Sequence, residues 1–312
     1  MIEEKIGKVI KGLGGLYEMR VASETESHTI SCRAKGALHR DEAKVLVGDD
    51  VRITIDTETP DGVVISEILE RKNQLIRPPM ANLDYIFTVF AAAKPEPVLE
   101  TVDKLVAIAE YNSITPVIII TKADVAPDAA RELADVYKLS GITVFVTSSQ
   151  DMSGISELSD FIRKNIAFGK TAAFAGASGV GKSTLINALF PELALKTAEI
   201  SKKIERGRHT TRHVELFPLG EASKAGYIAD TPGFSLIDFS RFDFFGIESL
   251  VATFPDIAKY HGKCRYADCA HVGEGEAECA VAAACRDGLI AKTRLASYRS
   301  IYSVLKNKNK YE

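Results

Sequence analysis

A glycine-rich segment in the second half of the chain carries the residues best suited to chemistry. Gly176–Ser183 has the spacing GxxxxGKS, follows an apolar run and precedes an amphipathic stretch. This context predicts a phosphate-binding loop, because glycines let backbone N–H groups face phosphates and a helix N-terminus adds favourable partial charge. A plain glycine-rich turn before a helix is the alternative. The residues predicted to contact nucleotide are Gly176, Ala177, Ser178, Gly179, Val180, Gly181, Lys182, Ser183 and Thr184.

Two later segments complete a predicted magnesium and γ-phosphate site. The Ser183 hydroxyl is expected to bind Mg²⁺, and Asp230, which ends the apolar run YIAD, to hold the ion through water. Gly233 follows at the DxxG spacing, so its amide is expected to bind the γ-phosphate. Thr210 or Thr211 of the GRHTT segment would complete the magnesium shell. Both segments are predicted to be ordered by the γ-phosphate and released on its loss.

The residues that would select the base come before the phosphate loop. Thr121, Lys122 and Asp124 belong to TKAD, which follows the apolar run PVIII and so lies at the carboxyl end of a predicted strand, where α/β sheets bind ligands. The Asp124 carboxylate can accept hydrogen bonds from N1–H and the exocyclic amine of guanine, a pattern that adenine lacks. GTP and GDP are therefore the predicted ligands, with an ATPase as the alternative. Backbone contacts to the base are predicted from Thr147, Ser148 and Ser149.

The residue that orients the attacking water is not the usual one. GTPases commonly use a Gln just after DxxG, but this chain has Phe234 there, and a phenyl ring cannot make the hydrogen bond. His209 in GRHTT is the predicted catalytic residue, because an imidazole can orient water near neutral pH. Contact with RNA or solvent is the alternative role for His209. Because the water would be positioned without strong acid–base help, we expect slow intrinsic hydrolysis. A partner would accelerate it by ordering the loop.

Three cysteines and a histidine lie within sixteen residues near the C-terminus. Cys264, Cys269, His271 and Cys279 have the types and spacing of a closed structural Zn²⁺ site. Cys285 is the alternative fourth ligand, and buried cysteines without a metal are the alternative to the whole site. The count of five cysteines, four of them clustered, suits a metal site better than a disulfide framework.

The pattern of apolar runs predicts the elements that position these residues. Residues 1–70 alternate short β-like runs with glycine turns, which predicts an all-β OB-fold barrel that binds RNA, with a barrel used only for packing as the alternative. Residues 71–238 carry continuous apolar runs separated by helical stretches, which predicts an α/β P-loop domain entered through a linker at Arg71–Pro79. Residues 239–312 are predicted to be mostly helical and to bind zinc. Phosphate contacts from the barrel are predicted from Arg33, Lys35, Arg40, Lys44 and Arg52.

Composition limits the compartment and the partners. No apolar run in the 312 residues approaches the roughly 20 needed to cross a bilayer, and the acidic start of the chain argues against a secretory signal. The protein is therefore predicted to be cytoplasmic and without membrane association. A monomer is expected, although no residue pattern in the sequence specifies the oligomeric state. The net charge of −3 means that any nucleic-acid contact must come from local patches. One such patch holds five cations between Ser201 and His213.

The order of these motifs resembles a known family over nearly the whole chain. TKAD and TSS precede the phosphate loop, whereas ordinary GTPases place them after the switches, so the chain looks circularly permuted. Together with IRPPMANLDYIFTVFAA, GRHTT, DTPGF and the Cys/His cluster, this order resembles the ribosome small subunit-dependent GTPase A family (RsgA, also called YjeQ or YloQ).

The resemblance implies an OB-fold, a permuted G domain and a zinc domain. It also implies GTP hydrolysis stimulated by the small ribosomal subunit, with its rRNA as partner, during late maturation. It supports His209 as the water-orienting residue and Cys279 over Cys285, although the gap before Cys279 is about two residues longer than the family pattern. The alternative function is a nucleotide-regulated RNA-binding assembly factor in which GTP binding rather than hydrolysis matters.

Overall fold

The computed structural model describes residues 2–22, 27–35, 44–56, 58–59, 62–166, 168–191, 214–220, 225–230 and 238–308. The chain divides into two compact units. The first contains Met1–Tyr85, Ser159–Phe174 and Phe190–Gly233, and the second contains Ile86–Leu158, Ala175–Leu189 and Phe234–Glu312. None of the helices in the described ranges is long and apolar enough to cross a membrane.

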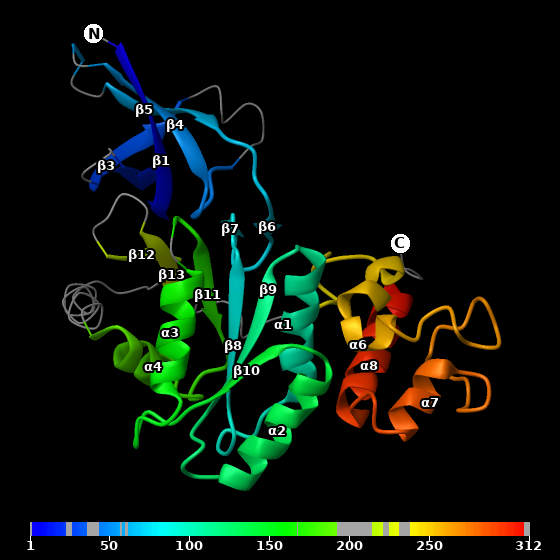
Figure 1. Ribbon diagram of the computed structural model, residues 1–312. Coiled ribbons are helices and arrows are strands. Elements are labelled where there is room, and N and C mark those ends of the chain that lie inside the picture. Colours follow the sequence, from blue (N-terminus) through cyan, green and yellow to red (C-terminus); the bar gives the residue numbers. More distant parts are fainter. Residues whose placement is uncertain are drawn as a thin grey trace. The chain divides into compact units, whose positions relative to one another are not determined.

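The N-terminal strands close into a five-stranded barrel (Figure 1), and their hydrogen-bonded order is β1-β2-β3-β5-β4. Neighbouring strands are antiparallel except β3 and β5, which are parallel. Alternate side chains such as Val9, Met19, Ile53 and Ile65 are completely buried and fill the interior. The predicted barrel is confirmed. Its strands are β1 (Ile2–Leu13), β2 (Leu16–Ala22), β3 (Ser27–Ala34), β4 (Asp50–Asp56) and β5 (Val63–Ile68).

The segment that follows the barrel is more structured than the expected linker. It forms β6 (Gln74–Leu75) and β7 (Met80–Ala81), which pair antiparallel. Arg71 donates to both carboxylate oxygens of Asp49, at 2.6 and 2.8 Å, and so fixes the start of this segment to the turn before β4. At that turn Gly48 has φ +95°, and a Cβ there would come 2.1 Å from the carbonyl oxygen of Ala81. The close approach requires glycine.

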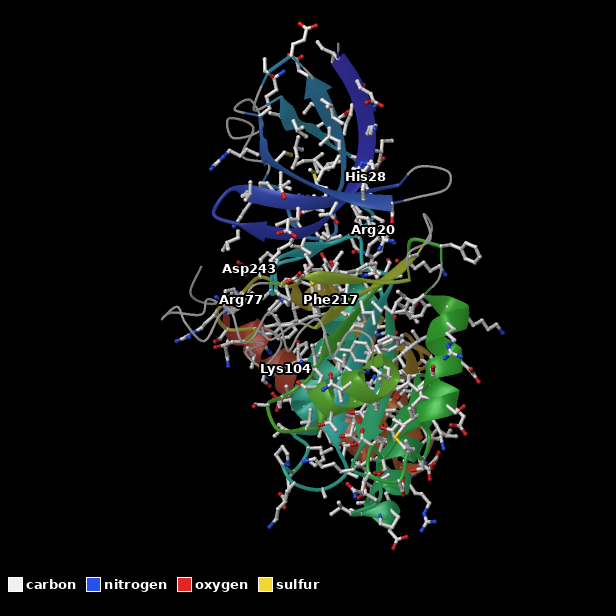
Figure 2. All side chains as sticks on the ribbon, turned by 90° about the vertical axis from the view of Figure 1, so that its left-hand side faces the viewer. Arg20, His28, Arg77, Lys104, Phe217 and Asp243 are labelled. Atoms are coloured by element: carbon white, nitrogen blue, oxygen red, sulfur yellow. The ribbon has the colours of Figure 1, made fainter. Side chains whose placement is uncertain are left out.

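Further contacts within the first unit tie the barrel to the end of the central sheet. The Arg20 side chain, labelled in Figure 2, donates to the Gly220 carbonyl oxygen at 3.1 Å. Lys11 of β1 forms an ion pair with Glu215 at 3.0 Å. Strand β12 (Leu216–Leu219) begins at the next residue. These contacts place one edge strand of the sheet beside the barrel.

Six strands form the central sheet in the order β10-β9-β8-β11-β13-β12. Pairs β9–β10 and β11–β13 are parallel, and β12 runs antiparallel to β13. Nearly every residue of β8, β9 and β11 is buried, as expected for a mainly parallel sheet covered on both faces. The predicted α/β class is confirmed. The remaining strands are β8 (Tyr85–Ala91), β9 (Thr115–Thr121), β10 (Thr143–Val146), β11 (Thr171–Ala175) and β13 (Gly226–Asp230).

Helices follow the strands of the second unit and complete its core. Val106 of α1 and Tyr137 of α2 pack with Ile118 and Ile120 of β9 in one buried cluster. Helix α2 begins with Pro127 at its first position, where the missing N–H has no intrahelical partner to lose. The helices are α1 (Leu99–Tyr111), α2 (Pro127–Leu139), α3 (Ile155–Asn165) and α4 (Lys182–Leu189).

The C-terminal part is helical, as predicted, and its last helix packs on α1 within the second unit (Figure 1). Two single 3-10 turns, η1 (Ile247–Ser249) and η2 (Val251–Thr253), lead into α6 (Pro255–Ala258). Helices α7 (Ala280–Arg286) and α8 (Lys292–Lys308) follow the Cys/His segment. The cysteine cluster therefore lies between short helices and is followed by one long one.

A buried ion cluster joins α8 to α1 and α6. The guanidinium of Arg294, 0% exposed, donates to Asp103 Oδ1 at 2.7 Å and to Asp256 Oδ1 at 3.0 Å. Burial lowers the pKa of Arg294, but the two carboxylates outweigh it and hold the pKa above its ordinary value. At Asp103, burial outweighs the opposing charge of Arg294 and raises the pKa of the carboxyl group. At Asp256, burial is outweighed by the charge of Arg294 and its hydrogen bonds, so the pKa is lowered. The hydroxyl of Ser140 also donates to Asp256, at 2.8 Å.

Candidate nucleotide site and metal centre

The GxxxxGKS segment forms a loop between β11 and α4. Gly179 and Gly181 have φ values of +81° and +91°, a left-handed conformation that side chains with a Cβ rarely adopt. A Cβ at Gly176 would come 2.3 Å from the carbonyl oxygen of Val89. Lys182 and Ser183 occupy the first turn of α4, so the helix N-terminus opens onto the loop. This is the backbone arrangement that a bound phosphate requires.

The TKAD segment is bonded directly to this loop, although 59 residues separate the bonded partners Thr121 and Val180. The buried Thr121 hydroxyl donates to the carbonyl oxygen of Val180 at 2.5 Å. The Lys122 ammonium donates to the carbonyl oxygens of Gly179 at 2.8 Å and Lys94 at 2.5 Å. Lys122 has φ +57°, which turns the chain sharply after β9. The TKAD segment and the phosphate loop are therefore held together by side-chain hydrogen bonds within one unit.

The TSS segment is held by backbone hydrogen bonds to the end of β9 and to the TKAD turn. The Thr147 amide donates to the Ile120 carbonyl oxygen at 2.7 Å, and the Ala123 amide donates to the Thr147 carbonyl oxygen at 3.2 Å. Thr147 and Ser148 are buried, whereas Ser149 is half-buried. The Asp124 carboxylate is exposed at the same turn. Its side chain is thus presented beside the loop that would receive the base.

The remaining predicted nucleotide contacts are only partly described. Strand β13 ends at Asp230, in parallel register with Phe174 near the end of β11. Gly233 and Phe234 lie outside the described residues, as do His209, Thr210 and Thr211. The switch segments therefore stay sequence predictions.

The Cys/His segment brings four ligand atoms together. Nδ1 of His271 lies 3.5 Å from Sγ of Cys264, 3.5 Å from Sγ of Cys269 and 3.4 Å from Sγ of Cys279. Sγ of Cys264 lies 4.0 Å from Sγ of Cys279. All four ligand atoms lie within 4.8 Å of one another, and Cys285 is not among them.

The spacing of these atoms fits a tetrahedral metal ion. With Zn–S bonds of about 2.3 Å and a Zn–N bond of about 2.0 Å, tetrahedral geometry requires S–S edges of about 3.8 Å and S–N edges of about 3.5 Å. The three S–N distances match this geometry, and the S–S distance of 4.0 Å between Cys264 and Cys279 is close to it. Backbone amides support the thiolates, because Ala280 N donates to Cys264 Sγ and Ala282 N to Cys279 Sγ, each at 3.4 Å. The cluster could hold a metal ion.

Sequence reasoning did not single out His261, whose Nδ1 lies 2.9 Å from Nε2 of His271. Its position three residues before Cys264 was a signal that could have drawn attention to it. Sequence reasoning likewise missed the carbonyl oxygen of Lys94 as an anchor for Lys122. A main-chain atom leaves no trace in residue type, so nothing in the sequence marks that contact.

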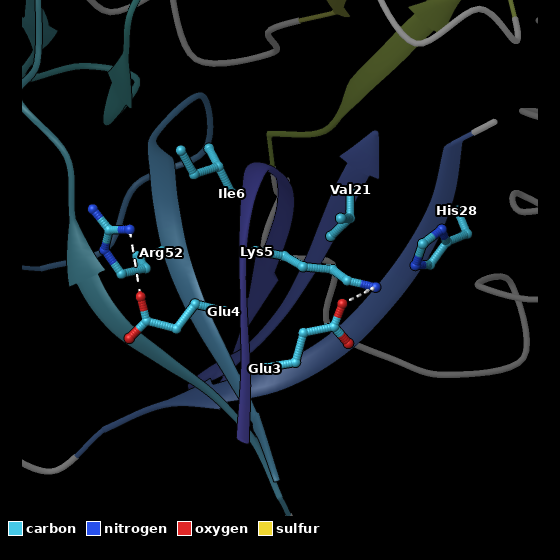
Figure 3. Close-up of a pocket in the computed structure, with 7 residues that line it drawn as sticks. All are labelled: Glu3, Glu4, Lys5, Ile6, Val21, His28 and Arg52. Carbon is cyan, nitrogen blue, oxygen red and sulfur yellow. Dashed lines mark ion pairs between the residues drawn. The ribbon is translucent and has the colours of Figure 1, made fainter. Parts of the chain in front are cut away.

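The barrel carries a pocket of about 590 Å³ (Figure 3). Lys5 is 3.2 Å from Glu3, and Arg52 is 3.6 Å from Glu4 and 2.8 Å from Glu67. A nucleic-acid phosphate that binds Arg52 must therefore compete with two carboxylates. Among the other predicted phosphate contacts, Arg33, Lys35 and Lys44 are exposed and Arg40 lies outside the described residues. The pocket is lined by Glu3, Glu4, Lys5, Ile6, Val21, His28 and Arg52.

Comparisons with known proteins agree with this arrangement. The sequence model described as RsgA GTPase matches residues 68–240, and that of the RsgA N-terminal domain matches residues 6–64. A protein of Agathobacter rectalis named small ribosomal subunit biogenesis GTPase RsgA is 38% identical over 313 aligned residues, covering 98% of this chain and 99% of the relative.

Two solved structures are similar over almost the whole chain. YloQ, described as a circularly permuted GTPase, is 34% identical with a TM-score of 0.76, covering 98% of this chain and 96% of the other. YjeQ from Thermotoga maritima is 29% identical with a TM-score of 0.76, covering 97% and 99%. Barrel, permuted P-loop domain and helical Cys/His segment thus occur here in one chain, and the chain belongs to the RsgA GTPase family.

Proposed function

We propose that this protein hydrolyses GTP during biogenesis of the small ribosomal subunit, which stimulates its activity. The main supporting observation is the hydrogen-bonded joint between the TKAD turn and the phosphate loop. There the side chains of Thr121 and Lys122 donate to the carbonyl oxygens of Val180 and Gly179. Because this joint brings Asp124 beside a phosphate-binding loop, one nucleotide can occupy both. Membership in the family supports GTP as that nucleotide, and the name of the A. rectalis relative supports the ribosomal partner.

The proposal assigns roles around the nucleotide. Lys182 binds the β- and γ-phosphates, and backbone N–H groups of the loop contact the remaining phosphate oxygens. Ser183 and Asp230, with Thr210 or Thr211, form the binding site for Mg²⁺, which offsets the phosphate charge when bound with GTP. The Gly233 amide binds the γ-phosphate. The remaining predicted nucleotide contacts are Thr147, Ser148, Ser149, Ala177, Ser178 and Thr184.

The metal centre is proposed to hold one structural Zn²⁺ ion through Cys264, Cys269, His271 and Cys279. Three thiolates and one imidazole form a closed ligand set that leaves no position for a substrate, so the ion would stabilise the fold of the C-terminal segment. The division into residues 1–70, 71–238 and 239–312, rRNA binding by the barrel and a cytoplasmic, monomeric state belong to the same proposal.

Hydrolysis with and without purified small ribosomal subunits tests the proposed partner. We expect the rate of phosphate release to rise about ten-fold or more with small subunits, because a partner that orders the switch segments stabilises the transition state. Large subunits serve as the control for non-specific rRNA effects, and the Lys182→Ala variant as the control for contaminating GTPases. Equal rates with and without small subunits would contradict a stimulatory role and favour a factor that acts through GTP binding.

His209→Ala is expected to keep GTP affinity but to lose most of the stimulated rate. The loss should be roughly ten- to a hundred-fold, at the lower end of acid–base effects, because the imidazole orients water rather than transferring a full proton. Single-turnover assays with saturating small subunits measure this rate. His213→Ala, the same change two residues after the GRHTT segment, is the matched control. An unchanged stimulated rate in His209→Ala would remove this residue from the mechanism.

A further inference from the structure

A second histidine contacts the metal centre without being one of its four ligands. Nδ1 of His261 lies 2.9 Å from Nε2 of His271. The two rings are nearly perpendicular, with an interplanar angle of 88° and centroids 5.2 Å apart. Edge-on geometry of this kind aims the ring N–H of one imidazole at the lone pair of the other. The contact is therefore a hydrogen bond between imidazoles.

The direction of this hydrogen bond follows from the ligand geometry. The nitrogen of His271 that faces the three sulfur atoms is Nδ1. A metal-bound Nδ1 uses its lone pair for the ion, so the ring proton resides on Nε2. His271 must therefore donate, and Nδ1 of His261 must accept, which leaves the His261 proton on its own Nε2.

Other hydrogen bonds hold the His271 backbone, and the ring of Tyr298 packs against the His271 ring with centroids 6.2 Å apart. The carbonyl oxygen of His271 accepts from Arg299 Nε at 2.9 Å, and the preceding carbonyl of Ala270 accepts from the Tyr298 hydroxyl at 3.2 Å. The backbone of His271 is left-handed, with φ +63°. The side chain is 0% exposed, so water cannot easily replace His261 as the acceptor for its buried N–H. Within the described part of the chain, His261 thus supplies the hydrogen bond to Nε2 of this ring.

We propose that His261 is a positioning residue of the metal centre: it accepts the Nε2–H hydrogen bond of His271 and holds Nδ1 toward the three thiolates. This inference rests on the proposed zinc ligand set. Partners of this kind orient the ligand ring and strengthen it as a donor, and their loss typically weakens metal binding about 10- to 100-fold. His261 therefore increases the affinity for the ion.

The test measures zinc affinity on the full-length protein. His261→Leu removes the acceptor with little change in volume, and we expect zinc to bind about 10- to 100-fold more weakly in competition with a chromophoric chelator. His261→Gln restores a carbonyl oxygen as acceptor, so its affinity should return to within a few-fold of the wild type. His28→Leu, the same substitution at an exposed barrel position, is the matched control.

A spectroscopic measurement separates orientation of the ring from general loss of structure. In the Co²⁺-substituted protein we expect His261→Leu to shift the d–d absorption bands, whereas His261→Gln and His28→Leu keep the wild-type spectrum. Zinc affinity of His261→Leu within two-fold of the wild type, with an unchanged cobalt spectrum, would overturn the proposal. A wild-type protein that binds no zinc would instead refute the metal site itself. GDP affinity measured on each variant reports whether the nucleotide domain has folded.

Discussion

Replacing Arg294 by leucine is expected to lower the free energy of unfolding by about 3–5 kcal/mol, because it removes the only guanidinium of a buried cluster and leaves its acidic partners unpaired. Arg294, Asp103 and Asp256 are all at most 2% exposed, so water cannot solvate the remaining carboxylates. Arg294 also packs over the ring of Phe254 at 4.5 Å, and this contact is lost as well. Urea denaturation followed by circular dichroism measures the effect.

Two comparisons test the electrostatic reason for this loss. Lys292→Leu removes a positive charge from an exposed position on the same helix and should change stability by no more than about 0.5 kcal/mol. Adding Asp103→Asn and Asp256→Asn to Arg294→Leu removes the unpaired charges and should recover part of the loss. A decrease of less than about 1 kcal/mol for Arg294→Leu alone would show that the cluster contributes little to stability.

Asp124→Asn is expected to weaken GTP binding about 10²- to 10⁴-fold. The carboxylate would accept two hydrogen bonds from guanine, and hydrogen bonds to a charged group contribute about 1.5–3 kcal/mol each. An asparagine amide keeps one acceptor and places a donor against the exocyclic amine of guanine. Xanthine carries a carbonyl oxygen at that position, so the same variant should bind XTP better than the wild type does. Competition against a fluorescent GDP analogue measures both affinities.

The exposed carboxylate of Asp128, at the start of α2, offers the matched control. Asp128→Asn makes the same chemical change four residues from Asp124 and should leave GTP and XTP affinities within two-fold of the wild type. ATP should compete poorly with every variant. Unchanged GTP affinity in Asp124→Asn, together with effective competition by ATP, would support an ATP-binding protein instead.

The sequence could predict those parts of the site in which binding requires particular residue types close together along the chain. Phosphate binding demands glycines at Gly176 and Gly181, followed by Lys182. The structure gives the physical reasons, because a Cβ at Gly176 would clash with the carbonyl oxygen of Val89 and Gly181 has a positive φ. Continuous apolar runs likewise predicted the central sheet, because buried parallel strands require them on both faces. The barrel strands were recognisable from their glycine turns.

Contacts between distant segments could not be predicted in the same way. Nothing local marks Arg294 as buried, because its partners lie 191 and 38 residues away and an arginine on a lysine-rich helix is ordinarily solvated. The apolar run Val45–Val47 ends where the backbone turns at Gly48, and β4 begins only at Asp50. The Arg71–Pro79 segment has the charge and prolines of a linker, yet Leu75 packs in a buried position. Tertiary packing decided each of these outcomes.

The hydrogen bond from Thr121 to Val180 has a consequence for biosynthesis. The TKAD segment leaves the ribosome first, and its bonded partner follows 59 residues later, an interval of about 3–12 s at translation rates of roughly 5–20 residues per second. During that interval the nascent chain has the TKAD turn without the phosphate loop that bonds to it. In the proposed site, GTP can bind only after the whole phosphate loop, up to Ser183, has emerged, and the nucleotide is then a late ligand that stabilises the completed domain by mass action.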